Sequence, residues 1–296
     1  MDKKLHPYLH HHLHVLGGVP HGDAGAAQVR SEPGGGCQVY RLNQRGFFGI
    51  FQTLAQAGAP AVALNLLAAH GFRPIFAVSI AFAALGIFLG STLKLQEEPF
   101  VKLGGARPAF FEKRAVGIAV LMFFLAFTYS GIISYIALCG EERGIANMSP
   151  FFLAYALGIT MARLNVGKYY DVNGPHYIIV GSFALLILSN GVLAVSSSVL
   201  PFSLGGAVFG VGYGALQPTL LAMAVKDIES ERRGAVNGTV MGAFDIGVGA
   251  GAVILGMVAS YSGYSAVYIV SAAAPLMGLL VYFAGKSTKI QRRILP

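Results

Sequence analysis

Asp245 is the residue of this chain whose position most directly suggests chemistry. It lies in the stretch GAFDIGVGAG, residues 242–251, where every other residue is glycine, alanine or apolar, and no basic residue lies between Arg233 and Lys286. Carboxylates inside membrane helices are costly and usually functional. Asp245 can bind and release a proton or pair with a cationic substrate. The alternative is a structural aspartate that hydrogen-bonds between helices and only orients them.

Helical spacing places Asp245 on a face of mostly small residues. These are Gly238, Met241, Gly242, Val248, Gly249 and Ala252. Small residues let neighbouring helices approach closely in a membrane. We therefore predict that this face packs against other helices or lines a water-filled cavity, so that Asp245 faces away from lipid.

The composition is that of a membrane protein. Of the 296 residues, 55% are hydrophobic and only 11% are charged, and the mean hydropathy is +0.63. A soluble protein has about 25% charged residues, so this chain has too few to cover a surface in water. The two cysteines lie far apart without a CxxC pair, which indicates neither a disulfide framework nor a zinc site.

Common catalytic motifs do not occur in the sequence, among them GxSxG, HExxH and GxxxxGK[ST]. The last of these is the phosphate-binding loop, so ATP-driven transport is not expected. We predict that the protein is not an enzyme and has neither a cofactor nor a metal site.

Eight segments have the roughly 20 mostly apolar residues that a transmembrane helix needs. They cover residues 47–69, 74–93, 116–138, 149–166, 177–196, 199–224, 238–260 and 265–285. The links are short except for 94–115, which separates a two-helix segment, 46–93, from a six-helix segment, 116–285, with a tail at 286–296. The predicted fold class is an all-α, polytopic membrane helix bundle with about eight spans.

The basic residues indicate the topology. Lys and Arg gather in the 94–115 loop, in two of the later links and in the tail, whereas the opposite side has only Arg73 and Arg143. The positive-inside rule therefore places the 94–115 loop and the C-terminus in the cytoplasm. The net charge of +8 then reflects topology. A nucleic-acid partner is not expected, because the charges are spread over separate short segments.

The chain contains an internal repeat at an offset of 192 residues, without gaps. The offset aligns Gly71 and Phe72 with Gly263 and Tyr264, and residues 76–86 with residues 268–278. The first two spans therefore resemble the last two in the same orientation. Chance matching of small residues in two apolar segments is the alternative.

Residues 1–45 do not fit this pattern. They are rich in glycine, proline and histidine, hold six of the eight histidines, and include no apolar run of 20 residues. We expect the segment to be disordered and foreign to the fold, from a shifted reading frame or an aberrant start. The alternative is a metal-binding tract, since imidazole binds nickel, copper and zinc.

One motif resembles the loop between the second and third spans of a half in the major facilitator superfamily. It is RLNVGKYYDVNG, with Arg163, Gly167, Asp171 and Gly174 at the motif positions. The resemblance implies that Asp171 lies near the start of a neighbouring helix and that Arg163 is an ion-pair partner at a cytoplasmic gate.

Two further motifs extend the resemblance. ESERRGAVNG, with Arg232 and Arg233, is similar to the loop that opens the fifth span of a half, which adds both arginines to the gate. AGAPAVA, around Pro60, partly resembles the exporter motif of the fifth span in the first half. The resemblance implies two six-span halves, so 116–285 corresponds to a C-terminal half and 46–93 to the end of an N-terminal half that lacks four spans.

Polar residues within the spans are candidate substrate contacts or interhelical hydrogen bonds. In the superfamily the first span of each half lines the cavity, which favours the first role for Tyr129 and Ser130. The whole set is Tyr129, Ser130, Ser134, Asn190 and Gln217. Candidate helix-packing residues are Pro60 and the ladder Gly206, Gly210 and Gly214.

The resemblance implies proton-coupled efflux of a small molecule by alternating access, with Asp245 as the coupling residue, in the cell membrane, a bacterial inner membrane. The expected partners are the small-molecule substrate, protons and the lipid bilayer. Two alternatives remain. The chain is a truncated membrane protein that does not transport, or a membrane-anchored protein that binds metal through its histidine-rich start.

Overall fold

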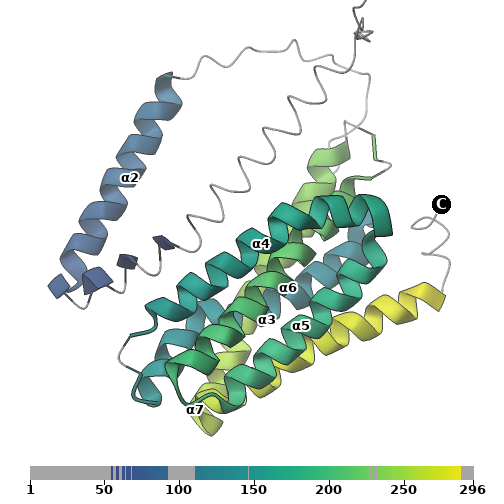
Figure 1. Ribbon diagram of the computed structural model, residues 1–296. Coiled ribbons are helices and arrows are strands. Elements are labelled where there is room, and N and C mark those ends of the chain that lie inside the picture. Colours follow the sequence, from purple (N-terminus) through teal and green to yellow (C-terminus); the bar gives the residue numbers. More distant parts are fainter. Residues whose placement is uncertain are drawn as a thin grey trace, which may run out of the picture. The chain divides into compact units, whose positions relative to one another are not determined.

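The computed structural model describes residues 55, 58–59, 62–63, 65–67, 69–92, 111–145, 147–226, 228–229 and 232–287. Their regular secondary structure is helical, as predicted (Figure 1). The elements are α2 (Phe72–Thr92), the short 3-10 turn η2 (Lys113–Ala115), α3 (Val116–Glu142), α4 (Ser149–Asn173), α5 (Pro175–Val195), α6 (Val199–Val225) and α7 (Arg233–Ser287). Predictions for residues 1–45, for most of the 94–115 loop and for Pro60 lie outside the described residues.

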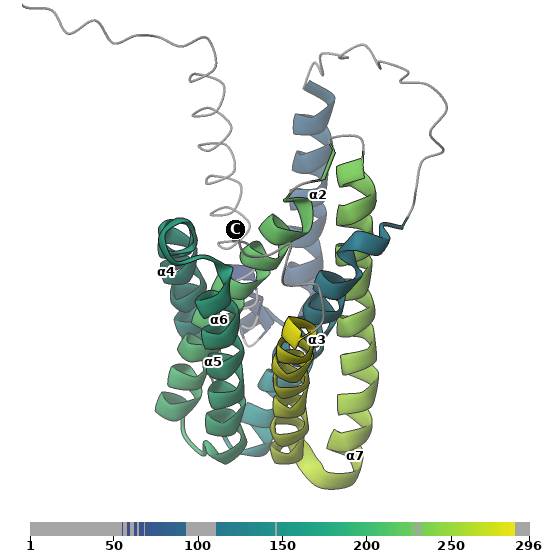
Figure 2. The ribbon, with the colours of Figure 1, turned by 90° about the vertical axis from the view of Figure 1, so that its right-hand side faces the viewer.

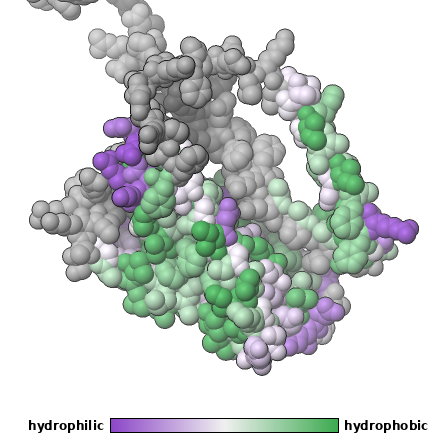
Figure 3. Space-filling model, turned by 180° about the vertical axis from the view of Figure 1, so that it is seen from behind, coloured by the Kyte–Doolittle hydropathy of each residue, from purple (hydrophilic) through white to green (hydrophobic). Residues whose placement is uncertain are grey.

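Five helices of the described part are long and apolar enough to cross a membrane. They are α2, α3 together with η2, α5, α6 and α7. Helix α4 is less apolar because it contains Arg163, Asn165 and Lys168. Much of the predicted span 47–69 is outside the described residues, so the number of eight spans stays a prediction. Figure 3 shows a mostly hydrophobic surface over the bundle, with hydrophilic residues toward its ends.

Helix α7 consists of two limbs, 233–262 and 264–287, which meet at Gly263. Gly263 has φ 75° and ψ 172°, a backbone conformation that favours glycine because a Cβ atom would clash there. The sequence repeat aligns Gly263 with Gly71, and Gly71 has nearly the same φ, 73°. Each of these glycines begins a helix, which supports the internal repeat.

The link predicted between α4 and α5 is shorter in the structure. The stretch 167–173 was expected in a loop but continues α4 to Asn173, because no proline lies between Pro150 and Pro175. Gly174 has φ 72°, and its N–H donates to the Tyr170 carbonyl oxygen at 2.9 Å. Pro175 then begins α5, where its missing N–H costs no hydrogen bond.

Helices α3 to α7 form a bundle in which successive helices run up and down (Figure 2). Helix α3 packs mainly on α7, α4 mainly on α6, and α5 on both α6 and α7. The largest fully buried side chains are aromatic, namely Tyr155, Tyr213, Tyr268, Phe151, Phe183, Phe202 and Phe209.

The two ends of the bundle differ in charge. At one end α3, α5 and the first limb of α7 begin and α4 and α6 finish, and we name it the basic end. It has the basic residues Lys113, Arg114, Lys168, Lys226, Arg232 and Arg233. At the opposite end, Arg143 is the one basic residue among those described in α3 to α7.

Candidate functional site

Arg163 lies inside α4, within the predicted span 149–166, although the motif that contains it resembles a loop. It precedes the end of the helix, Asn173, by 10 residues, which places it about 15 Å from that end at 1.5 Å per residue. Its guanidinium is partly buried, and Nη2 donates to Gln217 Oε1 of α6 at 3.1 Å. The helix continues through the motif, so Arg163 contacts the neighbouring helix at mid-depth.

Three tyrosines gather beside this pair. Tyr155 precedes Arg163 by two turns of α4, and Tyr213 precedes Gln217 by one turn of α6. The Tyr155 and Tyr213 rings lie 6.5 Å apart, centroid to centroid. The Tyr129 ring of α3 stacks on the Tyr213 ring with centroids 4.7 Å apart. Residues of α3, α4 and α6 thus form one cluster, which we name the arginine–tyrosine cluster and define as Tyr129, Tyr155, Arg163, Tyr213 and Gln217.

Asp245 directly follows Phe244, whose side chain lies at the edge of this cluster. The Phe244 ring lies 6.0 Å from the Tyr129 ring, centroid to centroid. Asp245 comes 12 residues after the start of α7, Arg233, or about 18 Å along the helix. It therefore lies at a depth similar to that of Arg163, measured from the basic end. Its side chain is exposed among the described residues.

Helix α3 packs on a different face of α7 from the small face that includes Asp245. A Cβ atom on Gly247 would lie 2.6 Å from the Phe123 carbonyl oxygen, and one on Gly251 would lie 2.8 Å from the Phe127 carbonyl oxygen. By contrast, Gly242 and Gly249 have open space beside them in the described structure. Helix α3 therefore packs on the Gly247 face, and the small residues beside Asp245 leave space around the carboxylate.

Two of the predicted cavity residues belong to the interior of the bundle instead. Asn190 is fully buried, and its Nδ2 donates to Thr128 Oγ1 at 3.0 Å. Thr128 also shares a hydrogen bond of 2.9 Å with Ser271. Ser130 is likewise buried, whereas Ser134 is partly buried. Asn190 thus links α5 to α3 and, through Thr128, to α7. Of the two roles considered for Asn190, substrate contact and interhelical hydrogen bond, the structure shows the second.

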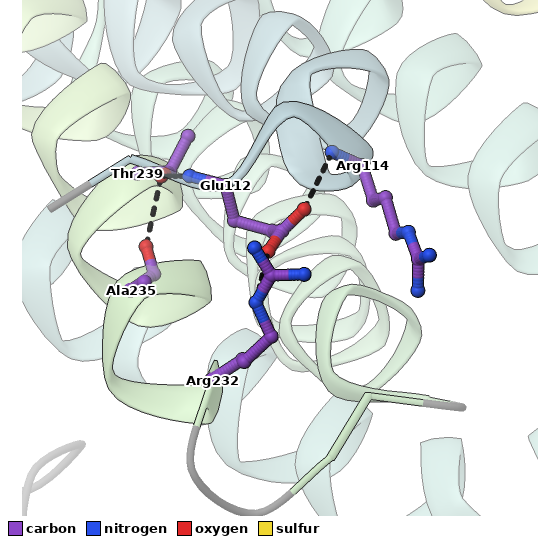
Figure 4. Close-up of polar contacts among 5 residues, drawn as sticks. All are labelled: Glu112, Arg114, Arg232, Ala235 and Thr239. Atoms are coloured by element: carbon purple, nitrogen blue, oxygen red, sulfur yellow. Dashed lines mark hydrogen bonds and ion pairs between the residues drawn. The ribbon is translucent and has the colours of Figure 1, made fainter. Parts of the chain in front are cut away.

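At the basic end, Glu112 connects η2 to the start of α7 (Figure 4). Glu112 Oε2 lies 3.1 Å from Arg232 Nε, with the side chains 4% and 45% exposed respectively. Glu112 Oε1 accepts a hydrogen bond of 3.2 Å from the Arg114 N–H and so caps η2. The Glu112 N–H donates to Thr239 Oγ1 of α7 at 2.9 Å. The start of α3 is thereby attached to the start of α7.

The other predicted gate residues are not joined in this way. Asp171 is exposed in the last turn of α4, and no other described residue bonds to its carboxylate. Arg233 Nε donates to the Ile228 carbonyl oxygen at 3.4 Å. Gly167 has open space around it in the described structure, and Gly174 forms the turn before α5. Of the predicted gate arginines, Arg232 is the one that the structure pairs with a described carboxylate.

The opposite end is held together by Arg143. Its Nη1 donates to the carbonyl oxygens of Leu193, at 3.0 Å, and Ser196. Its Nη2 donates to the Ala194 carbonyl oxygen at 2.9 Å and to Ser265 Oγ at 2.6 Å. The guanidinium therefore caps the C-terminal carbonyl groups of α5, where a cation is favourable, and reaches α7.

The predicted glycine ladder of α6 lies against α4. A Cβ atom on Gly206 would lie 2.9 Å from the Phe151 ring, and one on Gly214 would lie 2.8 Å from Ile159 Cα. A Cβ on Gly210 would clash with the Tyr155 carbonyl oxygen. This close approach brings Gln217 within reach of Arg163.

Sequence reasoning missed several residues of these sites, among them Glu112, Tyr155, Tyr213 and Phe244. Glu112 was assigned to a loop, and nothing local indicates its burial. The spacing of Tyr155 and Arg163, eight residues apart, was a usable signal, because it puts both on one face of a helix.

A bundle of long apolar helices, with a guanidinium and a carboxylate at mid-depth, is typical of a multi-pass membrane protein. The chain belongs to the Major Facilitator Superfamily, whose family model matches residues 44–227 and, in a second match, residues 148–294. It is also similar to the staphylopine export protein of Staphylococcus aureus. The two are 21% identical over 267 residues, which cover 85% of this chain and 67% of the relative. Membership of the superfamily makes this protein a membrane transporter of small molecules.

Proposed function

We propose that this protein exports a small molecule by alternating access, in exchange for protons. The observation that carries the proposal is Asp245, an exposed carboxylate about 18 Å along α7 and next to Phe244 at the edge of the arginine–tyrosine cluster. The export direction is supported by the relative in Staphylococcus aureus, whose name describes an export protein.

The proposed coupling uses the cost of an ionised carboxylate at membrane depth. Protonation of Asp245 from the outer side neutralises it and lets the protein return to the state that opens inward. Release of that proton to the cytoplasm restores the charged form. Such a cycle needs space around the carboxylate, which Gly242 and Gly249 provide in the described structure.

The contacts at the basic end support a gate. Glu112 and Arg232 attach α3 to α7 there, and we propose that the basic end is cytoplasmic, in a bacterial inner membrane. Arg233 and Asp171 lie at the same end. The lone described arginine at the opposite end of the bundle, Arg143, agrees with the positive-inside rule.

The experiment is transport by the purified full chain in liposomes with an imposed pH gradient, with staphylopine as the first probe. We expect uptake driven by the gradient and abolished by a proton ionophore. Asp245→Asn should lower gradient-driven uptake at least tenfold without a change in yield or insertion, because Asn keeps the size but does not ionise. Glu229→Gln, at an exposed residue of the link before α7, is the matched control. Unchanged uptake by Asp245→Asn would show that the carboxylate is not the coupling residue.

A further inference from the structure

Two pairs of consecutive basic residues meet at the basic end of the bundle. Lys113 and Arg114 lie in η2, directly before α3, and Arg232 and Arg233 lie at the start of α7. Glu112 contacts both pairs (Figure 4). Its Oε1 accepts a hydrogen bond of 3.2 Å from the Arg114 N–H, and its Oε2 lies 3.1 Å from Arg232 Nε. We name the four basic residues the basic patch.

The basic patch has an excess of positive charge. All four of its side chains are exposed. Among the described residues, Glu112 is the one carboxylate that pairs with them, and its partner is Arg232. No described residue bonds to the side chains of Lys113 or Arg114. Four positive charges are therefore balanced by one negative charge in the described structure.

The helix ends beside the basic patch add to its positive potential. Helix α3 has no acidic residue in its first turn, and its N-cap residue, Ala115, makes no side-chain hydrogen bond to the helix. The first turn of α7 likewise has no acidic residue. The N-terminus of a helix carries a partial positive charge, so basic side chains there are unfavourable unless an anion lies nearby. The charges of this region thus favour an anion from outside the chain.

The basic patch lies at the depth of phospholipid headgroups. Helix α3 has 27 residues, or a length of about 40 Å. The hydrocarbon core is about 30 Å thick, and the bilayer with its headgroups about 40–45 Å, so the ends of α3 reach the headgroup region. Phe111 and Val116, which flank η2 in the sequence, are 57% and 38% exposed. Exposed apolar and basic side chains therefore adjoin here, as expected at the boundary between acyl chains and headgroups.

We propose that the basic patch binds the headgroup of an anionic phospholipid. Lys113 and Arg114 contact the phosphate from η2, and the two arginines of α7 contact the same headgroup from the other side. Val116 lies against the beginning of an acyl chain. A zwitterionic headgroup brings its own ammonium group, which the patch repels, so the net negative charge of the lipid decides binding. This inference concerns a partner in the membrane and does not depend on the proposed transport.

The test is the thermal unfolding midpoint of the purified full chain in mixed micelles of a non-ionic detergent. Dihexanoyl phosphatidylglycerol and dihexanoyl phosphatidylcholine are the probes, because their acyl chains are the same and their headgroups differ in net charge. The concentration of each is varied at constant ionic strength. We expect a saturable rise of the midpoint with phosphatidylglycerol and a much smaller one with phosphatidylcholine. Inorganic phosphate should give no comparable rise, because it has no acyl chain.

Variants that remove one charge locate the site. Lys113→Gln and Arg114→Gln should each weaken phosphatidylglycerol binding about fivefold, the effect of one basic residue near an anionic membrane surface. Both side chains are exposed, so the variants should fold. Lys168→Gln is the matched control, because it removes a charge from an exposed residue of α4 at the same end of the bundle but outside the basic patch. It should leave binding unchanged. Lys113→Arg keeps the charge and should bind like the unaltered chain.

Several results would overturn the proposed lipid site. Equal rises with the two lipids would indicate apolar adsorption alone. Unchanged binding in Lys113→Gln and Arg114→Gln, or an equal loss in Lys168→Gln, would indicate attraction by the overall charge of the basic end. A rise with inorganic phosphate as large as that with phosphatidylglycerol would indicate a site for a free anion. None of these measurements involves transport, so the failure of this site and the failure of the proposed function are distinguishable.

Discussion

Glu112 Oε2 lies 3.1 Å from Arg232 Nε, and the two partners differ widely in exposure, at 4% and 45% of the side chain. The difference matters because the two side chains differ in their access to water once the ion pair is broken. An unpaired Arg232 can turn into water, whereas an unpaired Glu112 carboxylate would stay buried between η2 and α7.

The exposure difference predicts that Arg232→Gln destabilises the protein more than Glu112→Gln. Breaking a buried ion pair costs about 3–5 kcal/mol when a charge is left buried. Because Arg232 is partly exposed and screened, we expect about 1–2 kcal/mol for Arg232→Gln and less for Glu112→Gln. The unfolding midpoints of the purified variants in detergent measure the difference. Lys113→Gln, at an exposed neighbour, is the control, and equal losses for the two main variants would contradict the prediction.

Arg143→Lys is expected to destabilise the end of the bundle where α5 finishes. A lysine has one ammonium group and cannot reach the Leu193, Ala194 and Ser196 carbonyl oxygens and Ser265 together as the guanidinium does. Loss of hydrogen bonds that involve a charged group costs about 1.5–3 kcal/mol each, offset here by partial replacement by water and by the ammonium. Thermal unfolding of the variant measures the change. Arg73→Lys, at an exposed arginine of α2, provides the comparison, and a midpoint lowered no more than in that variant would show that the cap contributes little.

Gly210→Ala should push α4 and α6 apart. A Cβ atom there clashes with the Tyr155 carbonyl oxygen, and overpacking of this kind costs about 1–3 kcal/mol. Gly242→Ala, where the described structure leaves open space, is the matched control and should be neutral or slightly stabilising. A Gly210→Ala protein as stable as the Gly242→Ala protein would mean that α4 and α6 are not in close contact.

The proposed orientation predicts that a reporter fused after Pro296 is active if it requires the cytoplasm and inactive if it requires the outside. The reason is the excess of Lys and Arg at the basic end and in the tail. A pair of fusions, one enzyme active on each side of the membrane, makes the measurement. A second fusion after Gly144, at the opposite end of the bundle, should give the reverse result. The same activity at both positions would refute the up-and-down arrangement.

The sequence by itself determined the class and most of the helices. Runs of about 20 apolar residues and too few charges for a water-facing surface are properties of composition, which depend on no long-range contact. The repeat aligned Gly71 with Gly263, and both have the positive φ that glycine permits. The spacing of Gly206, Gly210 and Gly214 likewise predicts, from the helical period alone, that they share one face of α6.

Only the tertiary structure decided which side chains meet. The motif that contains Arg163 resembles a loop, yet α4 continues to Asn173, and the rotation of the helix then directs the guanidinium at Gln217. Small residues on both faces of α7 make either face suitable for close packing. In the structure, α3 packs on the face with Gly247 and Gly251. Glu112 became a buried ion-pair partner because Arg232 and Thr239 come from a distant helix. Such pairings depend on helix rotation and on contacts between residues far apart in the chain. Helical period and local propensity therefore do not predict them.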